Sequence, residues 1–285
     1  MRLCVSSEIC AVLPDRTPLP FQAGIDLAKW AGFEEFDFSL ESRHLLDEGW
    51  EAALDARASA IARAGMRIRY AHIPFDYPRP GDEEGWKRFS LATLRAIDQA
   101  ALWGVDCAAI HPRCFMKPDY DADREYADAV AFLEPFCGHA RARGVTLGIE
   151  IMRGAGASAP ARIRRFATDT DVLIRLADEL GAGICWDTGH AHISLQEQGK
   201  SIRKVGSRLK MVHINDNFAE DDVHLAPFLG RINWDEVVQA LRDIGYGGSM
   251  NLEVGCSRLP EPLRAPYAAY MAAAGRHLID LFEKA

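Results

Sequence analysis

The stretch Gly148-Ile149-Glu150-Ile151 places one carboxylate among apolar residues. Side chains of a strand point to opposite faces in turn, so the apolar residues at 147, 149 and 151 can face a helical layer while Glu150 points the other way. The same arrangement recurs at 184–190 (ICWDTGH), 212–217 (VHINDN) and 251–254 (NLEV). Several strands would thus each direct one potential metal ligand inward, as a metal site inside a barrel of strands requires.

Strand-like and helix-like segments alternate along the whole chain. The strands are predicted at 2–7, 34–38, 67–73, 106–111, 145–151, 183–187, 209–214 and 248–254. The helices are predicted at 22–31, 50–64, 83–103, 122–143, 169–180, 196–205, 234–244 and 263–283. Eight alternations without a linker favour a closed barrel over an open doubly wound sheet, and no Gly-rich phosphate loop follows the first strand. We therefore predict an α/β fold, with one (β/α)8 TIM barrel domain over residues 1–285.

The composition indicates a soluble protein. Of the 285 residues 48% are hydrophobic, which is enough for a sizeable core, but charges interrupt each apolar stretch well before the roughly 20 residues that span a bilayer. Residues 1–8 resemble a first strand and lack the pattern of a secretion signal. The seven cysteines are scattered without disulfide or zinc-knuckle spacing, so we interpret them as small buried residues of a cytoplasmic protein.

The charge pattern argues against a nucleic-acid partner. The formal net charge of −8 would repel a polyanion. The densest basic run contains Arg162, Arg164 and Arg165. It is interpreted as a solvated loop or helix start, with an anion contact above the site as the alternative.

Potential ligands end six consecutive predicted strands. In a barrel of this kind the chemistry lies at the C-terminal ends of the strands. The residues found there are His72, His111, Glu150, Asp187, His213 and Glu253. Four of them, Glu150, Asp187, His213 and Glu253, form a mixed nitrogen and oxygen set suited to one divalent ion such as Mn, Co, Fe, Zn or Mg. The alternative is a buried ion-pair network, which we disfavour because the strands beside them offer no inward Lys or Arg.

The two glutamates also suit proton transfer. Glu150 and Glu253 come from the fifth and eighth strands, so they could approach a substrate from two faces. A metal ion polarises a carbonyl and stabilises an enediolate, while a carboxylate removes the neighbouring proton. We therefore predict Glu150 and Glu253 as the catalytic acid/base pair of an enzyme.

Further polar residues are candidates for substrate contacts. His190 is expected in the loop above the sixth strand, where it would touch substrate or a second ion, or cap a helix. His72 and His111 could bind substrate, act as further ligands or hydrogen-bond the carboxylates. Asp222 and His224, spaced i, i+2 on an extended segment, could contact substrate or a second metal, or only order the loop. The predicted substrate-binding set is His72, His111, His190 and His224. Weaker or structural roles are expected for His192, for His139 and His277 on helix surfaces, and for Trp186 in packing.

These motifs resemble the xylose isomerase-like TIM-barrel superfamily, and in particular its sugar phosphate isomerase/epimerase family. The resemblance runs from AHIP at 71–74 and IHP at 110–112 through DTGH at 187–190 and HIND at 213–216 to LEV at 252–254. The segment 222–234 resembles the family's Asp-x-His, Pro-Gly-x-Gly and Asp-Trp pattern. It departs from it at 226–229, where APFL replaces the usual Pro-Gly turn and leaves the shape of the loop open.

The resemblance implies a metal-dependent isomerase or epimerase of a sugar, sugar phosphate or keto-polyol. It assigns one divalent ion to Glu150, Asp187, His213 and Glu253, and places His190 near substrate oxygens. The same superfamily contains type IV apurinic endonucleases, whose nine zinc ligands all have counterparts here. Phosphodiester cleavage is therefore the first alternative, followed by a related dehydratase and a catalytically silent sugar-binding barrel, which both glutamates argue against. A small carbohydrate is the expected partner, without nucleic acid or membrane, and homo-oligomer formation stays open.

Overall fold

The computed structural model describes residues 1–10, 19–155, 163–256 and 259–284. Eight parallel strands form one sheet in the order β7-β6-β5-β4-β3-β2-β1-β8. The strands are β1 (Leu3–Ser6), β2 (Glu35–Ser39), β3 (Arg67–His72), β4 (Cys107–Ile110), β5 (Leu147–Glu150), β6 (Gly183–Asp187), β7 (Leu209–His213) and β8 (Met250–Leu252). A parallel bridge joins Ile214 to Leu252, and Ile214 N donates to Asn251 O at 2.8 Å. This bridge brings β7 and β8 together, so the predicted barrel is confirmed.

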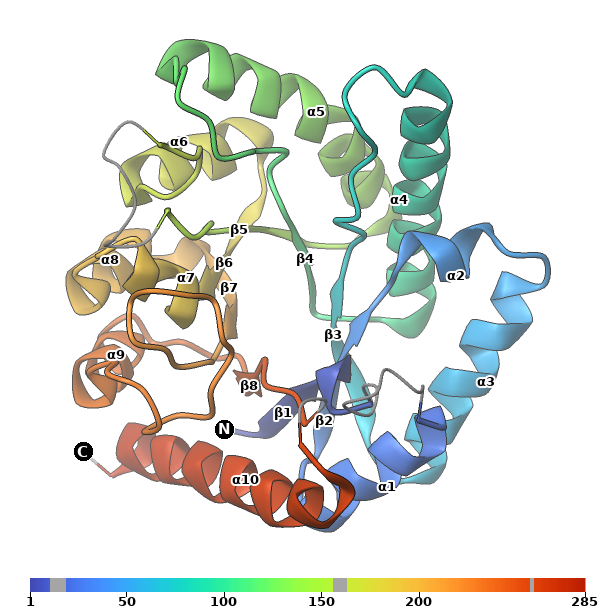
Figure 1. The fold of residues 1–285 in the computed structure, drawn as a ribbon, viewed down its shortest axis with the longest axis vertical. Helices are drawn as coiled ribbons and strands as arrows, with labels where there is room; N and C mark the ends of the chain where they lie inside the picture. The colour runs from blue at the N-terminus through green and yellow to red at the C-terminus, as the bar shows by residue number, and fades with distance from the viewer. Residues whose placement is uncertain (11–18, 156–162, 257–258, 285) are drawn as a thin grey trace.

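The helices form an outer layer around the strands (Figure 1). The helices are α1 (Phe21–Ala31), α2 (Ser42–Leu46), α3 (Trp50–Arg63), α4 (Glu83–Trp103), α5 (Ala122–Arg143), α6 (Thr170–Leu180), α7 (Thr188–Ile193), α8 (Gln198–Val205), α9 (Trp234–Asp243) and α10 (Glu261–Glu283). The predicted order is confirmed, although β8 is shorter than the predicted strand 248–254, and α2 and α7 were not predicted. Among the described residues, no helix is both long and apolar enough to cross a membrane.

The short helix α7 corrects the expected place of His190. Asp187, the last residue of β6, caps α7, because its Oδ1 accepts a hydrogen bond from His190 N at 2.6 Å. A carboxylate at this position satisfies one of the free N–H groups that begin every helix. His190 therefore lies on a buried helix that starts directly at the strand end, and not in a loop.

The two faces of the strands have different environments. The outward apolar residues of β5, among them Leu147 and Ile149, are buried in the core between barrel and helices, as the alternation predicted. A smaller cluster fills the interior of the barrel: Cys4, Tyr70, Cys107, Ala109, Cys185 and Met211. His72, Asp187 and His213 each follow a member of this cluster by two residues, so they form the next inward layer toward the C-terminal strand ends. All seven cysteines are free, and only Cys10 is not buried.

Candidate metal and substrate site

The four residues predicted as metal ligands converge at the C-terminal ends of the strands. Glu150, Asp187, His213 and Glu253 each offer one ligand atom, and these atoms all lie within 4.8 Å of one another. Glu150, Asp187 and His213 end their strands, whereas Glu253 lies one residue beyond β8. In the described part of the chain no Lys or Arg forms an ion pair with any of the four. Convergence without a cation to balance the carboxylates is what a metal site requires.

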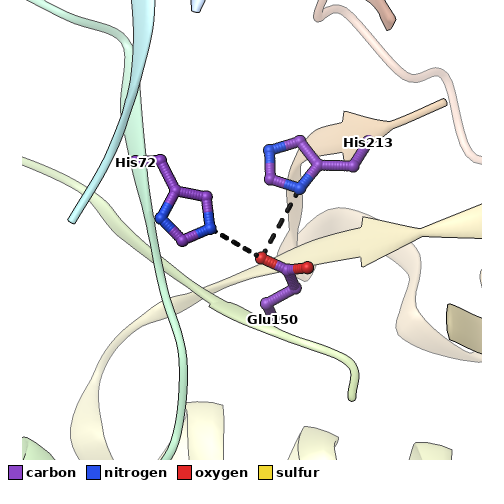
Figure 2. Close-up of side chains that lie close together, drawn as sticks. All are labelled: His72, Glu150 and His213. Carbon is purple, nitrogen blue, oxygen red and sulfur yellow. Dashed lines mark ion pairs between the residues drawn. The ribbon is translucent and has the colours of Figure 1, made fainter. Parts of the chain in front are cut away.

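Glu150 lies at the centre of this group. Figure 2 shows its carboxylate between the rings of His72 and His213, with Oε2 3.3 Å from His72 Nε2 and 3.5 Å from His213 Nδ1. His111 Nε2 lies 3.2 Å from the same oxygen. His72 Nδ1 is 2.8 Å from Ile73 O, which can only accept, so Nδ1 carries a proton and Nε2 is the ring nitrogen that faces Glu150.

Two buried atoms of this group lack a hydrogen-bond partner among the described residues. They are Glu150 Oε2 and His213 Nδ1. Buried polar atoms are rarely left without a partner, and a carboxylate oxygen beside imidazole nitrogens is a donor set that divalent transition metals accept. The residues present therefore fit a divalent cation.

A second cluster lies beside the first, toward the surface. Asp222 Oδ2 is 3.2 Å from His190 Nε2, and Asp222 Oδ1 is 3.3 Å from His224 Nε2. The Nδ1 atoms of the two rings lie 2.9 Å from backbone oxygens of Ile151 and Glu253, which fixes the ring orientations. These three side chains also satisfy the geometry of a candidate metal cluster. Further contacts join these three residues to the group around Glu150, so that one polar region contains His72, His111, Glu150, Asp187, His190, His213, Asp222, His224 and Glu253.

The electrostatics separate the two glutamates in the ion-free chain. Burial alone would raise the pKa of Glu150, but His111 and His213 hold it well below its usual value. Burial and the carboxylates of Glu150 and Asp187 raise the pKa of Glu253 well above its usual value, and outweigh the histidines nearby. Glu150 is thus the stronger acid of the two, as expected where carboxylates crowd together.

The pKa values of the histidines also shift in different directions. Burial lowers the pKa of His111 to about 4, although Glu150 opposes the shift. For His190 and His224 burial also favours the neutral ring, but the neighbouring carboxylates raise the pKa well above the usual value. For His213 burial acts in the same way, and Cys185, Glu253, Glu150 and Asp37 together raise its pKa well above the usual value.

The loop between β7 and α9 carries Asp222 and His224, and Asp216 organises it. The Asp216 carboxylate accepts hydrogen bonds at 3.0–3.1 Å from the backbone N–H groups of Phe228, Gly230 and Ile232 and from the indole of Trp234. The turn that departs from the family pattern is therefore held by a buried carboxylate. His224 has a φ of 45° and not the expected extended conformation, yet its ring still reaches Asp222.

A cleft of about 1160 Å³ opens beside the second cluster. Its polar wall includes Glu8, Asp222 and His224, and its apolar wall includes Phe38, Phe75 and Phe218. A volume of this order accommodates small-molecule ligands. Glu8, whose Oε2 lies 3.5 Å from His224 Nδ1, belongs to the short 3-10 helix Ser7–Cys10 and was not singled out from the sequence.

The remaining sequence candidates that the structure describes lie outside this site. Arg162 falls outside the described residues, and the backbone of Arg164 pairs with that of Lys117 in an isolated bridge. Trp186 is fully buried and donates to Gln198 Oε1 at 3.2 Å, consistent with packing. Three further histidines that the sequence analysis considered have separate surroundings: His192 contacts Asn217, His139 contacts Asp98, and His277 is exposed.

Known proteins resemble this chain over all or part of its length. An uncharacterized protein of Sinorhizobium fredii is 24% identical over 264 residues, which cover 82% of this chain and 81% of that protein. A D-psicose 3-epimerase of Enterocloster bolteae is 31% identical over 137 residues, 47% of this chain and 41% of the epimerase. A solved D-tagatose 3-epimerase-like protein superposes with a TM-score of 0.75 at 20% identity, covering 100% of this chain and 99% of the other. The family described as xylose isomerase-like TIM barrel matches residues 25–276, and the chain belongs to that family.

Proposed function

We propose that this chain is a divalent-metal-dependent isomerase or epimerase of a small carbohydrate. The observation that carries the proposal is the convergence of Glu150, Asp187, His213 and Glu253, with ligand atoms within 4.8 Å of one another and no Lys or Arg paired with them in the described residues. These four residues would hold one ion. When bound, the ion would polarise the substrate carbonyl and so acidify the neighbouring C–H bond.

Glu150 and Glu253 would move the proton. They extend from β5 and from the end of β8, on different sides of the barrel mouth. Each carboxylate has two oxygens, so one can bind the ion while the other accepts or donates a proton at the carbon beside the carbonyl. A glutamate on each face allows the proton to leave from one side and return on the other, which inverts that carbon.

The surrounding histidines would orient the substrate. His72, His111, His190 and His224 project toward the two clusters, with His190 and His224 held through Nδ1 by backbone oxygens. Fixed rings can hydrogen-bond sugar hydroxyls without further ordering. The D-psicose 3-epimerase relative points to ketoses as the first substrates to test.

The test combines metal loading with isotope exchange. Protein stripped with a chelator should be inactive and should regain activity with one of Mn, Co, Mg, Zn or Fe. A screen of ketoses, inososes and hydroxypyruvate in heavy water should place deuterium at the carbon that epimerises or isomerises. Full activity without metal would refute the assignment of the site. Turnover without deuterium incorporation would remove the two glutamates as a proton-transfer pair.

Phosphodiester cleavage is the second candidate function. The observation that favours it is the cluster of His190, Asp222 and His224, which offers a second site for an ion beside the first. The net charge of −8 disfavours binding to a polyanion. Metal analysis of the purified protein separates the two, since the isomerase requires one ion per chain and the nuclease several.

A further inference from the structure

Asp37 lies behind His213 on the side away from the proposed ion. It belongs to β2, faces the barrel interior and is buried. Its Oδ2 is 3.2 Å from His213 Nε2 and accepts a hydrogen bond at 2.7 Å from Asn251 Nδ2. Among the described residues, His213 is the only cationic partner of Asp37 within 4.0 Å.

This contact determines which ring nitrogen of His213 faces the carboxylates. A carboxylate can only accept, so the Nε2 of His213 carries a proton toward Asp37. Nδ1 is then the nitrogen that faces the carboxylates and that can bind an ion once it has lost its proton, and it lies 3.3 Å from Glu253 Oε2 and 3.5 Å from Glu150 Oε2. Asn251 holds the Asp37 carboxylate in this orientation.

We propose that Asp37 is a positioning residue for the metal site, because it fixes the ring orientation and tautomer of His213 and increases the basicity of Nδ1. The proposal rests on the proposed function, which makes His213 a ligand. Partners of this kind commonly change metal affinity by about 10–100-fold when they are removed. Nothing in the sequence pattern of the ligands themselves pointed to Asp37.

Three variants test how the Asp37 carboxylate affects His213. Asp37→Leu keeps the side-chain size and removes the acceptor, so the Nε2 proton of His213 has no partner and the tautomer with the proton on Nδ1 competes with the ion. Asp37→Asn removes the charge but keeps an oxygen acceptor. Glu35→Gln is the matched control, because Glu35 is a buried carboxylate of the same strand that contacts Ser249 and Arg69 and not His213.

The first measurement is the affinity of the metal-free protein for Mn²⁺ and Zn²⁺ by titration calorimetry. We expect Asp37→Leu to weaken binding by about 10–100-fold, Asp37→Asn to weaken it measurably but less, and Glu35→Gln to leave it at the wild-type value. Equal affinities in wild type and Asp37→Leu would overturn the proposal, as would an equal loss in Glu35→Gln. If Asp37→Leu does not fold, unchanged affinity in Asp37→Asn overturns it.

The second measurement is independent of the ion. The Nε2 proton of His213 should give a slowly exchanging low-field NMR signal in the wild type, in Asp37→Asn and in Glu35→Gln, and this signal should be lost in Asp37→Leu. Failure of the wild type to take up any of Mn, Co, Mg, Zn or Fe would refute the proposed function. The ring signal would still decide on Asp37: its loss in Asp37→Leu alone supports the positioning role, and its persistence there overturns it.

Discussion

Metal binding should release protons, because the pKa values of two of the four candidate ligands are raised in the ion-free chain. The raised pKa values of His213 and Glu253 keep both groups protonated at pH values where they would otherwise be free, whereas the lowered pKa of Glu150 leaves it ionised. An ion must displace both protons to reach Nδ1 of His213 and the carboxylate of Glu253.

The pH dependence of the apparent metal affinity follows from the number of protons displaced. Below the raised pKa values of His213 and Glu253, each unit of pH decrease should lower the logarithm of the apparent affinity by about two. The affinity must fall as the pH falls, because protons and the ion compete for the same atoms. As pH rises through the two pKa values, the slope should decline toward zero and the affinity should reach its maximum.

Calorimetric titration in buffers of different ionisation enthalpy measures the released protons directly. We expect about two protons per ion in the wild type on the acidic side, and about one in Glu253→Gln, which has no carboxyl proton to lose. Glu150→Gln is the control, because Glu150 is already ionised and its replacement removes no proton. A wild-type affinity that does not change with pH, or an equal proton count in Glu253→Gln and wild type, would refute the reasoning.

Three further predictions concern catalysis, stability and the alternative function. Glu150→Gln and Glu253→Gln should each reduce turnover by at least about two orders of magnitude, and a variant that retains both metal and near-normal turnover would exclude its glutamate as acid or base. Asp216→Ala should lower the free energy of unfolding by on the order of 3 kcal/mol, because several N–H groups of the loop lose their acceptor; urea unfolding measures this, and a change near zero would show that the loop is held by other contacts. Abasic duplex DNA at low salt should be neither bound nor incised, and metal-dependent incision at catalytic protein concentration would favour the nuclease.

The alternation of elements was readable from the sequence because it is a local property. Every predicted strand and helix has a counterpart in the structure, since apolar periodicity and the glycines that end helices are local signals. The helix α7 was missed for a specific reason. Asp187 was interpreted only as a ligand, whereas its two oxygens also cap α7 and accept from Asn215 Nδ2 at 2.9 Å. The sequence shows only that a carboxylate ends the strand, and it does not show how many contacts that carboxylate makes.

The site was predictable as far as it depends on strand ends. Residues at the C-terminal ends of barrel strands lie near one another, so the candidate ligands could be named before their geometry was known. The sequence also predicts that Asp37 points into the barrel, because it alternates with the apolar residues Phe36 and Phe38 in a predicted strand. Its partner could not be inferred in this way. His213 is 176 residues away, and only closure of the barrel brings the two together.

The sequence also treats Glu150 and Glu253 as equivalent, and the structure does not. Glu150 has three imidazole nitrogens within 3.5 Å of Oε2, and His111 and His213 hold its pKa well below the usual value. Glu253 lies in the field of two other carboxylates, and retaining a proton removes that repulsion. A divalent ion would supply the missing positive charge and remove the reason for the difference. The two glutamates should therefore become similar only when the ion is bound, which is the state in which an epimerase needs them to exchange the roles of acid and base.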